Sequence, residues 1–107
     1  ERLLDGQLVV AVLDLADFAA AGTDDADGAA EALRAIRGAE VGALVRHLHG
    51  GGLRASLRAA SDRVDVSAIA RAEGGGGHRA AAGVTSQRSA ADFVAWLAAA
   101  VKAQLDA

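Results

Sequence analysis

The chain has 107 residues, enough for one domain with a single core, and its 52% hydrophobic content includes only 3% aromatic residues. It contains no cysteine, which excludes disulfide bonds and thiolate metal sites. A formal charge of −3 at pH 7 argues against a surface that wraps long nucleic acid, because such a surface needs clustered basic residues. No stretch reaches the roughly 18 apolar residues of a membrane helix. We therefore expect a cytoplasmic protein without membrane contact.

Charge is distributed unevenly along the chain. Residues 1–50 carry a net charge of −5, residues 51–90 a net charge of +3, and residues 91–107 a net charge of −1. The positive segment also contains the longest glycine run of the sequence, at residues 74–77. This distribution favours a local anion site over a groove for a long polyanion.

The first part of the chain predicts a strand followed by two helices. Residues 7–15 form a short apolar run rich in valine, which is typical of a buried strand. Residues 14–22 predict a short helix that ends at a glycine. Residues 23–38 predict a second helix, because threonine and aspartate supply caps and negative charge at its start and a glycine ends it.

A hairpin is predicted over residues 39–61, with the sequence HGGG at residues 49–52 as its turn. In the second strand of this hairpin, arginine and leucine alternate with a period of two. The alternation places Arg54 and Arg58 on one face and the leucines on the other.

The last part of the chain predicts a helix, a strand and a helix. Residues 63–74 predict a short helix capped by Asp65, and residues 80–86 predict a strand. Residues 89–107 predict a long helix that begins at Ser89 and repeats large apolar residues every four positions. The resulting order indicates a single α/β or α+β domain with a mixed sheet flanked by helices.

The sequence EGGGGHRAAAG at residues 73–83 is the strongest candidate for chemistry. Consecutive glycines let backbone N–H groups approach a ligand closely. His78 adds a titratable donor and Arg79 a forked cation suited to phosphate. The pattern is not that of the familiar phosphate loops, because no Lys-Ser/Thr pair follows the glycines. From composition alone, a flexible surface loop is at least as good an interpretation as a ligand-binding loop.

Three segments resemble a known family. GGGGHRAAAG (74–83), VDVSAIARA (64–72) and LRASLRA (53–59) are similar to the C-terminal DHH-associated substrate-binding domain of DHH-family phosphoesterases. Within that family, the sequence looks most like the NrnA-type nanoRNases, and the similarity extends over roughly residues 7–103. NanoRNases of this type hydrolyse short 5′-phosphorylated oligoribonucleotides and 3′-phosphoadenosine 5′-phosphate.

The resemblance implies a set of substrate-binding residues, namely Gly75, Gly76, Gly77, His78, Arg79 and Arg58. The glycines and His78 would line the cleft, with His78 contacting the phosphate or sugar. Arg58 would bind a terminal phosphate or stack on a base, and Arg79 would assist or pack outward. Some relatives carry a hydroxyl residue directly after this arginine, whereas Ala59 supplies none.

The resemblance also implies a catalytic domain that precedes this one. Members of the family hold two manganese ions in an N-terminal domain with an Asp-His-His motif, where the metals activate water and neutralise the phosphate. That motif is absent from this sequence, which has histidines only at positions 47, 49 and 78. We therefore expect residues 1–107 to be one substrate-binding domain of a longer protein, without catalytic or metal residues and inactive alone. Its expected partners are its own catalytic domain, short RNA or DNA oligonucleotides or nucleotides, and a second copy in a homodimer.

Several alternatives stay open. The domain could belong to a RecJ-like exonuclease or a cyclic-dinucleotide phosphodiesterase, whose C-terminal domains share the glycine–histidine block. It could also be a stand-alone nucleic-acid-binding module, or a structural domain whose glycine loop packs against another subunit. Three residues have simpler expected roles. Arg54 is expected to be a solvated strand residue, His49 a turn residue and Trp96 a core or domain-contact residue.

Overall fold

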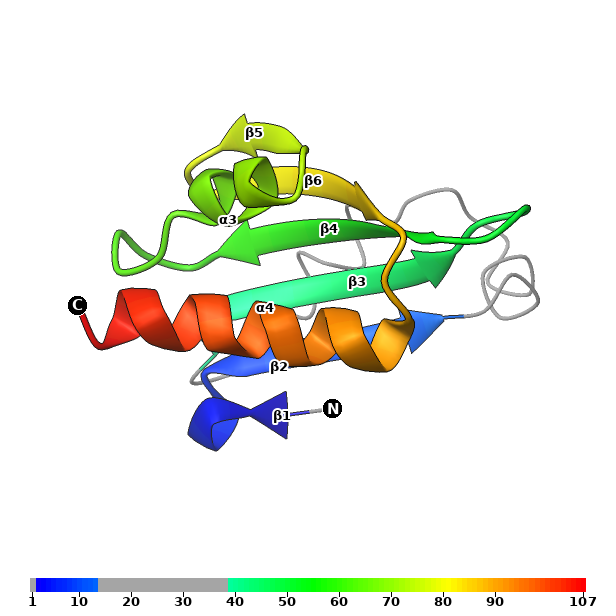
Figure 1. Cartoon of the computed structure of the whole chain (residues 1–107). Coiled ribbons are helices and arrows are strands. Elements are labelled where there is room, and N and C mark those ends of the chain that lie inside the picture. Colours follow the sequence, from blue (N-terminus) through cyan, green and yellow to red (C-terminus); the bar gives the residue numbers. More distant parts are fainter. Residues whose placement is uncertain (1, 14–38) are drawn as a thin grey trace.

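The computed structural model describes residues 2–13 and 39–107, and these residues form a six-stranded mixed sheet with helices on one face (Figure 1). The strands lie in the order β1-β2-β3-β4-β6-β5. Their bounds are Arg2–Leu3 (β1), Leu8–Leu13 (β2), Val41–His47 (β3), Leu53–Ala59 (β4), Gly76–His78 (β5) and Ala81–Ser86 (β6). A 3-10 helix, Leu4–Gly6 (η1), connects β1 to β2. The predicted α/β class is confirmed.

β2 and β3 form a parallel pair, whereas the other neighbouring strands are antiparallel. The valine-rich run of β2 suits a strand because branched side chains pack well on a pleated surface. The predicted hairpin is confirmed: β3 and β4 pair in register from Val41 with Ala59 to His47 with Leu53. The two helices predicted at residues 14–22 and 23–38 lie outside the described residues.

The two described helices begin at the predicted caps. The Asp65 carboxylate accepts hydrogen bonds from backbone N–H groups in the first turn of α3 (Val66–Ala72). The Ser89 hydroxyl accepts one from the Asp92 N–H, at 3.1 Å, at the start of α4 (Ala90–Leu105). The Gln104 side chain bonds both backbone groups of Asp65, at 2.7 and 2.9 Å. This pair of bonds ties the start of α3 to the end of α4.

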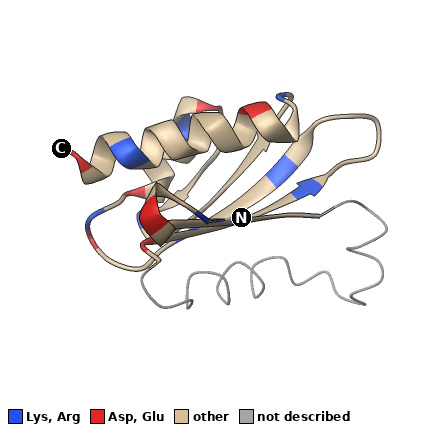
Figure 2. Ribbon diagram, turned by 90° about the horizontal axis from the view of Figure 1, so that it is seen from below, with Lys and Arg blue, Asp and Glu red and all other residues tan. Residues whose placement is uncertain are grey.

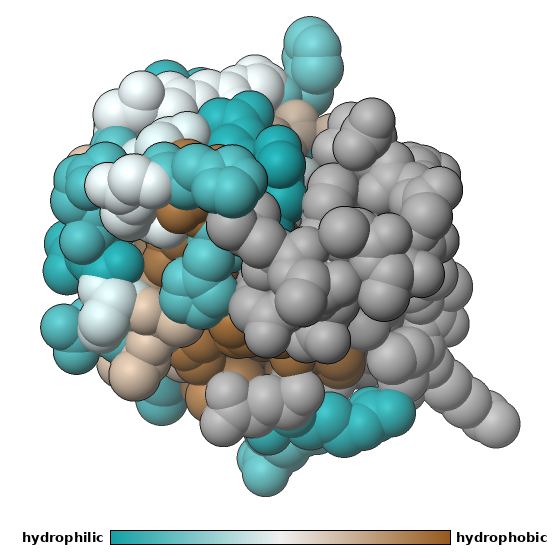
Figure 3. All heavy atoms as spheres, turned by 90° about the vertical axis from the view of Figure 1, so that its right-hand side faces the viewer, coloured by the Kyte–Doolittle hydropathy of each residue, from teal (hydrophilic) through white to brown (hydrophobic). Residues whose placement is uncertain are grey.

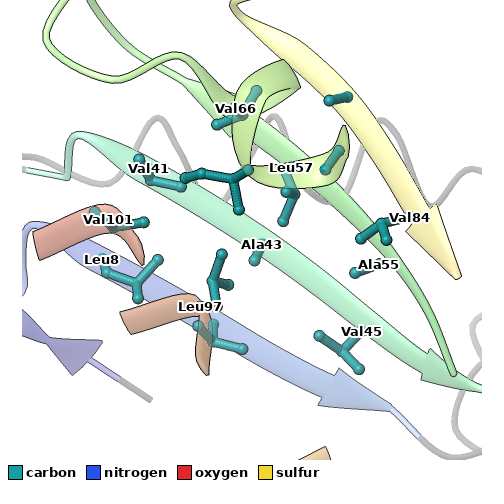
Figure 4. Close-up of a cluster of buried hydrophobic side chains, with 14 of the residues drawn as sticks. Leu8, Val41, Ala43, Val45, Ala55, Leu57, Val66, Val84, Leu97 and Val101 are labelled. Atoms are coloured by element: carbon teal, nitrogen blue, oxygen red, sulfur yellow. The ribbon is translucent and has the colours of Figure 1, made fainter. Parts of the chain in front are cut away.

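Both helices cover the same face of the sheet, and the core lies between them and the strands (Figures 1 and 4). Figure 4 shows side chains from β2, β3, β4 and β6 meeting Val66 of α3 and Leu97 of α4. Leu57, Leu97 and Phe93 have no exposed surface. Burying one side chain of this size contributes about 1.5–3 kcal/mol. The alternation in LRASLRA is therefore confirmed, because its leucines face this core.

The sequence did not predict the two edge strands, β1 and β5. Glycine is depleted in strands, so residues 74–77 indicated a loop. In the structure, Gly76, Gly77 and His78 pair with Gly83, Ala82 and Ala81 of β6. The pairing gives the glycine segment a defined position at one edge of the sheet.

Apolar surface gathers where β2 ends and α4 begins, and brown surface is visible on this side of the molecule (Figure 3). A groove of about 370 Å³ is lined there by Leu3, Val12, Ala90, Ala91, Val94 and Ala95. Among the described residues, Val12 is the large apolar side chain that is exposed, at 41%. Neither described helix is long and apolar enough to cross a membrane.

Candidate functional site

The face of the sheet opposite α3 and α4 carries the arginines of β4. Side chains alternate along a strand, and directly paired residues share a face. Arg54, Ser56 and Arg58 therefore lie on this face together with their partners on β6, which are Thr85, Gly83 and Ala81. The same register adds Gly76 and His78 of β5. Figure 2 shows α4 on one side of the sheet and basic segments, in blue, on its strands.

A cavity of about 260 Å³ opens on this face. Three strands supply its lining, which consists of Arg54, Ser56, Arg58, Gly76, Gly77, Ala81, Ala82 and Gly83. Among the residues that the structure describes, the lining contains two guanidinium groups and a hydroxyl but no carboxylate. A cavity with this lining favours an anion, because arginine and hydroxyl groups donate hydrogen bonds to phosphate oxygens.

Arg54, which we expected to be a solvated strand residue, is partly exposed and lines the cavity wall. Its guanidinium lies over Gly83, where a Cβ atom would collide with it. Arg54 Nη1 also donates a hydrogen bond to Thr85 Oγ1 at 3.3 Å. The absence of a side chain at Gly83 thus makes room for the guanidinium.

Arg58 and Ser56 complete the β4 side of the cavity. Arg58 Nη1 donates to the backbone carbonyl of Leu57 at 3.1 Å, which holds its guanidinium at a different place from that of Arg54. Ser56, midway between the two arginines, is buried. Arg58 and two residues of the glycine segment, Gly76 and Gly77, thus line the same cavity. The alternation in LRASLRA already carried the signal for Ser56, because it shares a face with both arginines.

The four glycines of residues 74–77 have different reasons to lack side chains. Gly74 has φ of +88° and ends α3, with its N–H donating to the Arg71 carbonyl at 3.1 Å. A Cβ at Gly75 or Gly77 would collide with the backbone of β6. A Cβ at Gly76 would meet no atom within 4 Å, and Gly76 lines the cavity. Only Gly76 therefore leaves open space on the cavity side.

His78 and Arg79 diverge after the glycines. His78 is exposed, pairs with Ala81 and lies on the cavity face at the end of β5. Arg79 does not line the cavity: its Nη1 donates to the Ser61 carbonyl at 2.7 Å, and its Nη2 lies 3.2 Å from an Asp62 carboxylate oxygen. Arg79 therefore connects the β5–β6 turn to the segment before α3.

An ion pair holds the start of the glycine segment. Arg88 Nε lies 2.5 Å from Glu73 Oε2, which also accepts from the Ser86 hydroxyl at 2.8 Å. The Arg88 guanidinium stacks 5.4 Å from the centre of the Trp96 ring. Hydrogen bonds from Arg88 and then Ser86 lower the pKa of Glu73 from its usual 4.5. These contacts tie the residue before Gly74 to the end of β6.

Metal ligands do not gather in the part of the chain that the structure describes. Within residues 2–13 and 39–107, no three His, Asp or Glu side chains lie close enough together to hold a metal ion. The cavity instead offers nitrogen and hydroxyl donors, which bind anions. The described residues thus suit the recognition of a phosphate group and do not fit a two-metal centre.

Comparison with known structures supports the fold of this domain. An exopolyphosphatase-related protein from Bacteroides fragilis matches with a TM-score of 0.79 and 16% identity, over 94% of this chain and 30% of its own. A pGpG-specific phosphodiesterase, PggH from Vibrio cholerae, matches with a TM-score of 0.59 and 19% identity, over 89% of this chain and 33% of its own. This chain thus spans about a third of the length of either protein. No match was found among curated proteins.

The match to a family model is more direct. The model of the DHHA1 domain matches residues 5–105, which include every described strand from β2 to β6 and both described helices. This range contains the three segments that carried the resemblance. The chain therefore belongs to the DHHA1 domain family, an accessory domain of DHH-family phosphoesterases.

Proposed function

We propose that this chain is the substrate-binding domain of a manganese-dependent phosphoesterase that hydrolyses short 5′-phosphorylated oligoribonucleotides and 3′-phosphoadenosine 5′-phosphate. The observation that carries this proposal is the cavity in which Arg54, Ser56 and Arg58 face the glycine backbone of β5. Guanidinium groups form forked, charge-assisted hydrogen bonds with phosphate. The bare backbone at Gly76 lets a sugar or base approach closely.

The dimensions of the cavity favour a short ligand. A volume of about 260 Å³ suits the end of a small nucleotide ligand. Proteins that bind long single strands use an extended basic groove that covers roughly 4–16 nucleotides per fold. The Vibrio cholerae neighbour is a pGpG-specific phosphodiesterase, and pGpG is a linear 5′-phosphorylated dinucleotide. These points favour nanoRNA over the longer substrate of a RecJ-like exonuclease.

The proposed roles of the residues follow from their positions. Arg58 binds the terminal phosphate, and His78, at the end of β5, donates a hydrogen bond to a phosphate or sugar oxygen. Gly75 and Gly77 position β5, while Gly76 forms the surface against which the nucleotide lies. Arg79 acts indirectly, since it holds the β5–β6 turn. The manganese ions belong to a catalytic domain outside this chain.

Calorimetric titration of this chain tests the proposal with three ligands that share the same bases. The ligands are a 5′-phosphorylated diribonucleotide, the same dinucleotide without its 5′-phosphate, and the cyclic dinucleotide. We expect the 5′-phosphorylated form to bind most tightly, because it alone presents a terminal phosphate to Arg58. Arg58→Ala and His78→Ala should each weaken its binding by about tenfold or more.

Arg71→Gln is the matched control for these variants. Arg71 is an exposed residue of α3, on the opposite side of the sheet, and its guanidinium contacts Ser67. The control should bind like the wild type. No binding of the 5′-phosphorylated dinucleotide, or equal binding by the wild type, Arg58→Ala and His78→Ala, would refute the proposal. Tighter binding of the cyclic ligand would instead assign the domain to a cyclic-dinucleotide phosphodiesterase.

A further inference from the structure

Arg54 differs from three other arginines of this domain, each of which forms an ion pair with a carboxylate. Arg63, Arg79 and Arg88 each lie within 4 Å of a carboxylate, on Glu40, Asp62 and Glu73 respectively. Within residues 2–13 and 39–107, Arg54 has no carboxylate partner, and its guanidinium donates a hydrogen bond to the neutral hydroxyl of Thr85. The positive charge of Arg54 is therefore not neutralised inside the described part of the chain.

The guanidinium of Arg54 is nevertheless held in place. Its Nη2, Cζ and Nε atoms all lie close to the space above Gly83, and Thr85 Oγ1 accepts from its Nη1. A solvated arginine on a strand would need neither a glycine beneath it nor a hydroxyl beside it. An arginine that is already ordered loses less conformational entropy when it binds an anion. Arg54 is thus arranged as a donor at the cavity wall.

Arg54 and Arg58 occupy separate places in one cavity. The two residues are four positions apart on β4, which corresponds to about 13 Å between their Cα atoms. Their guanidinium groups have different anchors, since one lies over Gly83 and the other beside the Leu57 carbonyl. One phosphate pairs in a forked manner with a single guanidinium. Two separately anchored arginines therefore suit a ligand that carries two phosphate groups.

We infer that Arg54 forms a second anion subsite, which selects ligands with a second phosphate a nucleoside away from the one at Arg58. This inference rests on the proposed function and deepens it. The ligand class is a short nucleotide with two phosphates, either a bisphosphorylated mononucleotide or a 5′-phosphorylated dinucleotide. Arg58 holds the terminal phosphate, the nucleoside lies across Ser56 and Gly76, and Arg54 holds the second phosphate.

The test compares two ligands that differ by one phosphate. Adenosine 5′-monophosphate and adenosine 3′,5′-bisphosphate are titrated into this chain by calorimetry, and the ratio of their dissociation constants is the readout. The wild type should prefer the bisphosphate by about tenfold or more, as expected for one additional charge-assisted contact. Arg54→Gln should reduce this ratio to about one while it changes the affinity for the monophosphate by less than about twofold.

Two further variants separate position from charge. Thr85→Val removes the hydroxyl that holds Arg54 but keeps every charge, and it should lower the ratio partially. Arg71→Gln removes the same charge from α3 and should leave the ratio unchanged. Circular dichroism and thermal unfolding check that each variant is folded, and Arg54→Lys replaces Arg54→Gln if the latter does not fold. The lysine variant should retain part of the preference, because it keeps the charge without the fork.

The outcomes distinguish this inference from the proposed function. Equal wild-type affinity for the two ligands, or the same loss for both ligands in Arg54→Gln, would overturn the second subsite and leave the proposed function standing. A fall in the ratio for Arg71→Gln equal to that for Arg54→Gln would also overturn it. Failure of the wild type to bind either ligand or the 5′-phosphorylated dinucleotide would overturn both.

Discussion

Residues 50–52 and 74–77 are both glycine runs, and each adjoins a histidine in the sequence. The first run forms the exposed turn between β3 and β4, where its three glycines have φ of +83°, +104° and +82°. The second run ends α3 and becomes the edge strand β5. The two runs have similar compositions but different secondary structures.

The difference lies in what a side chain would meet. A Cβ at Gly50 or Gly51 would meet no atom within 4 Å, so the backbone conformation alone requires glycine there. A Cβ at Gly75 or Gly77 would meet the backbone of β6. Gly50 and Gly51 thus serve the backbone conformation of a turn, whereas Gly75 and Gly77 permit the close approach of two strands. Only Gly76 has neither constraint, and it borders the cavity.

The largest expected loss of stability comes from a substitution at Gly75. Gly75→Ala places a methyl group against the Gly83 carbonyl and Val84, and neither backbone atom can move without disturbing β6. We expect a loss of about 2–3 kcal/mol in the free energy of unfolding. Gly51→Ala is the matched control from the first run, and its left-handed backbone should cost only about 1 kcal/mol. Urea denaturation measures both, and equal losses would contradict the distinction.

A smaller effect concerns the ion pair between Glu73 and Arg88, which lies at the start of the second run. The pKa of Glu73 is lowered in the folded protein. The charged Glu73 carboxylate therefore stabilises the fold at pH values above its usual pKa of 4.5. This contribution is lost as the pH falls from 4.5 through the lower folded pKa. Glu73→Gln should therefore be less stable than the wild type at pH 7, with a difference that shrinks in acid. Denaturation at several pH values measures this difference, and parallel pH profiles would argue against the role of Glu73.

Asp65 should supply acid sensitivity that remains in Glu73→Gln. The pKa of Asp65 is lowered, first by the hydrogen bond from the Ser67 hydroxyl and also by backbone N–H groups of α3. The contribution of Asp65 to stability is likewise present at pH values above its usual pKa of 3.8, and it is lost as the pH falls through the lower pKa of the folded state. The acid transition of the variant should therefore be weakened but not abolished.

The smallest expected effect on stability comes from a substitution at Gly76. Gly76→Ala adds a methyl group in open space, so the free energy of unfolding should change by less than about 0.5 kcal/mol. The same methyl group enters the cavity and should weaken binding of a 5′-phosphorylated dinucleotide several-fold. Urea denaturation and calorimetry give the two values. Unchanged affinity would show that the ligand does not lie against β5.

Much of the fold could be predicted because its signals are local. Asp65 and Ser89 act as helix caps within their own first turns, and the leucine alternation of β4 reports its buried face. β5 could not be predicted, because glycine has no side chain whose pattern would indicate a strand. The partner of Gly76 in the sheet, Gly83, also lies on a different strand, β6. The position of Arg54 over Gly83 could not be predicted for a similar reason, because the two residues are distant in sequence.

The amino-acid sequence by itself determined β2, β3, β4, β6, α3 and α4 and the presence of a basic, glycine-rich segment, since caps, periodicity and charge act over a few residues. It also carried the segments that match the DHHA1 domain family. Only the tertiary structure decided which arginines share a cavity, and that Arg79 turns toward Asp62 while Arg54 lies over Gly83. The physical reason is that strand register brings together residues far apart in the chain, and register depends on the packing of the whole sheet.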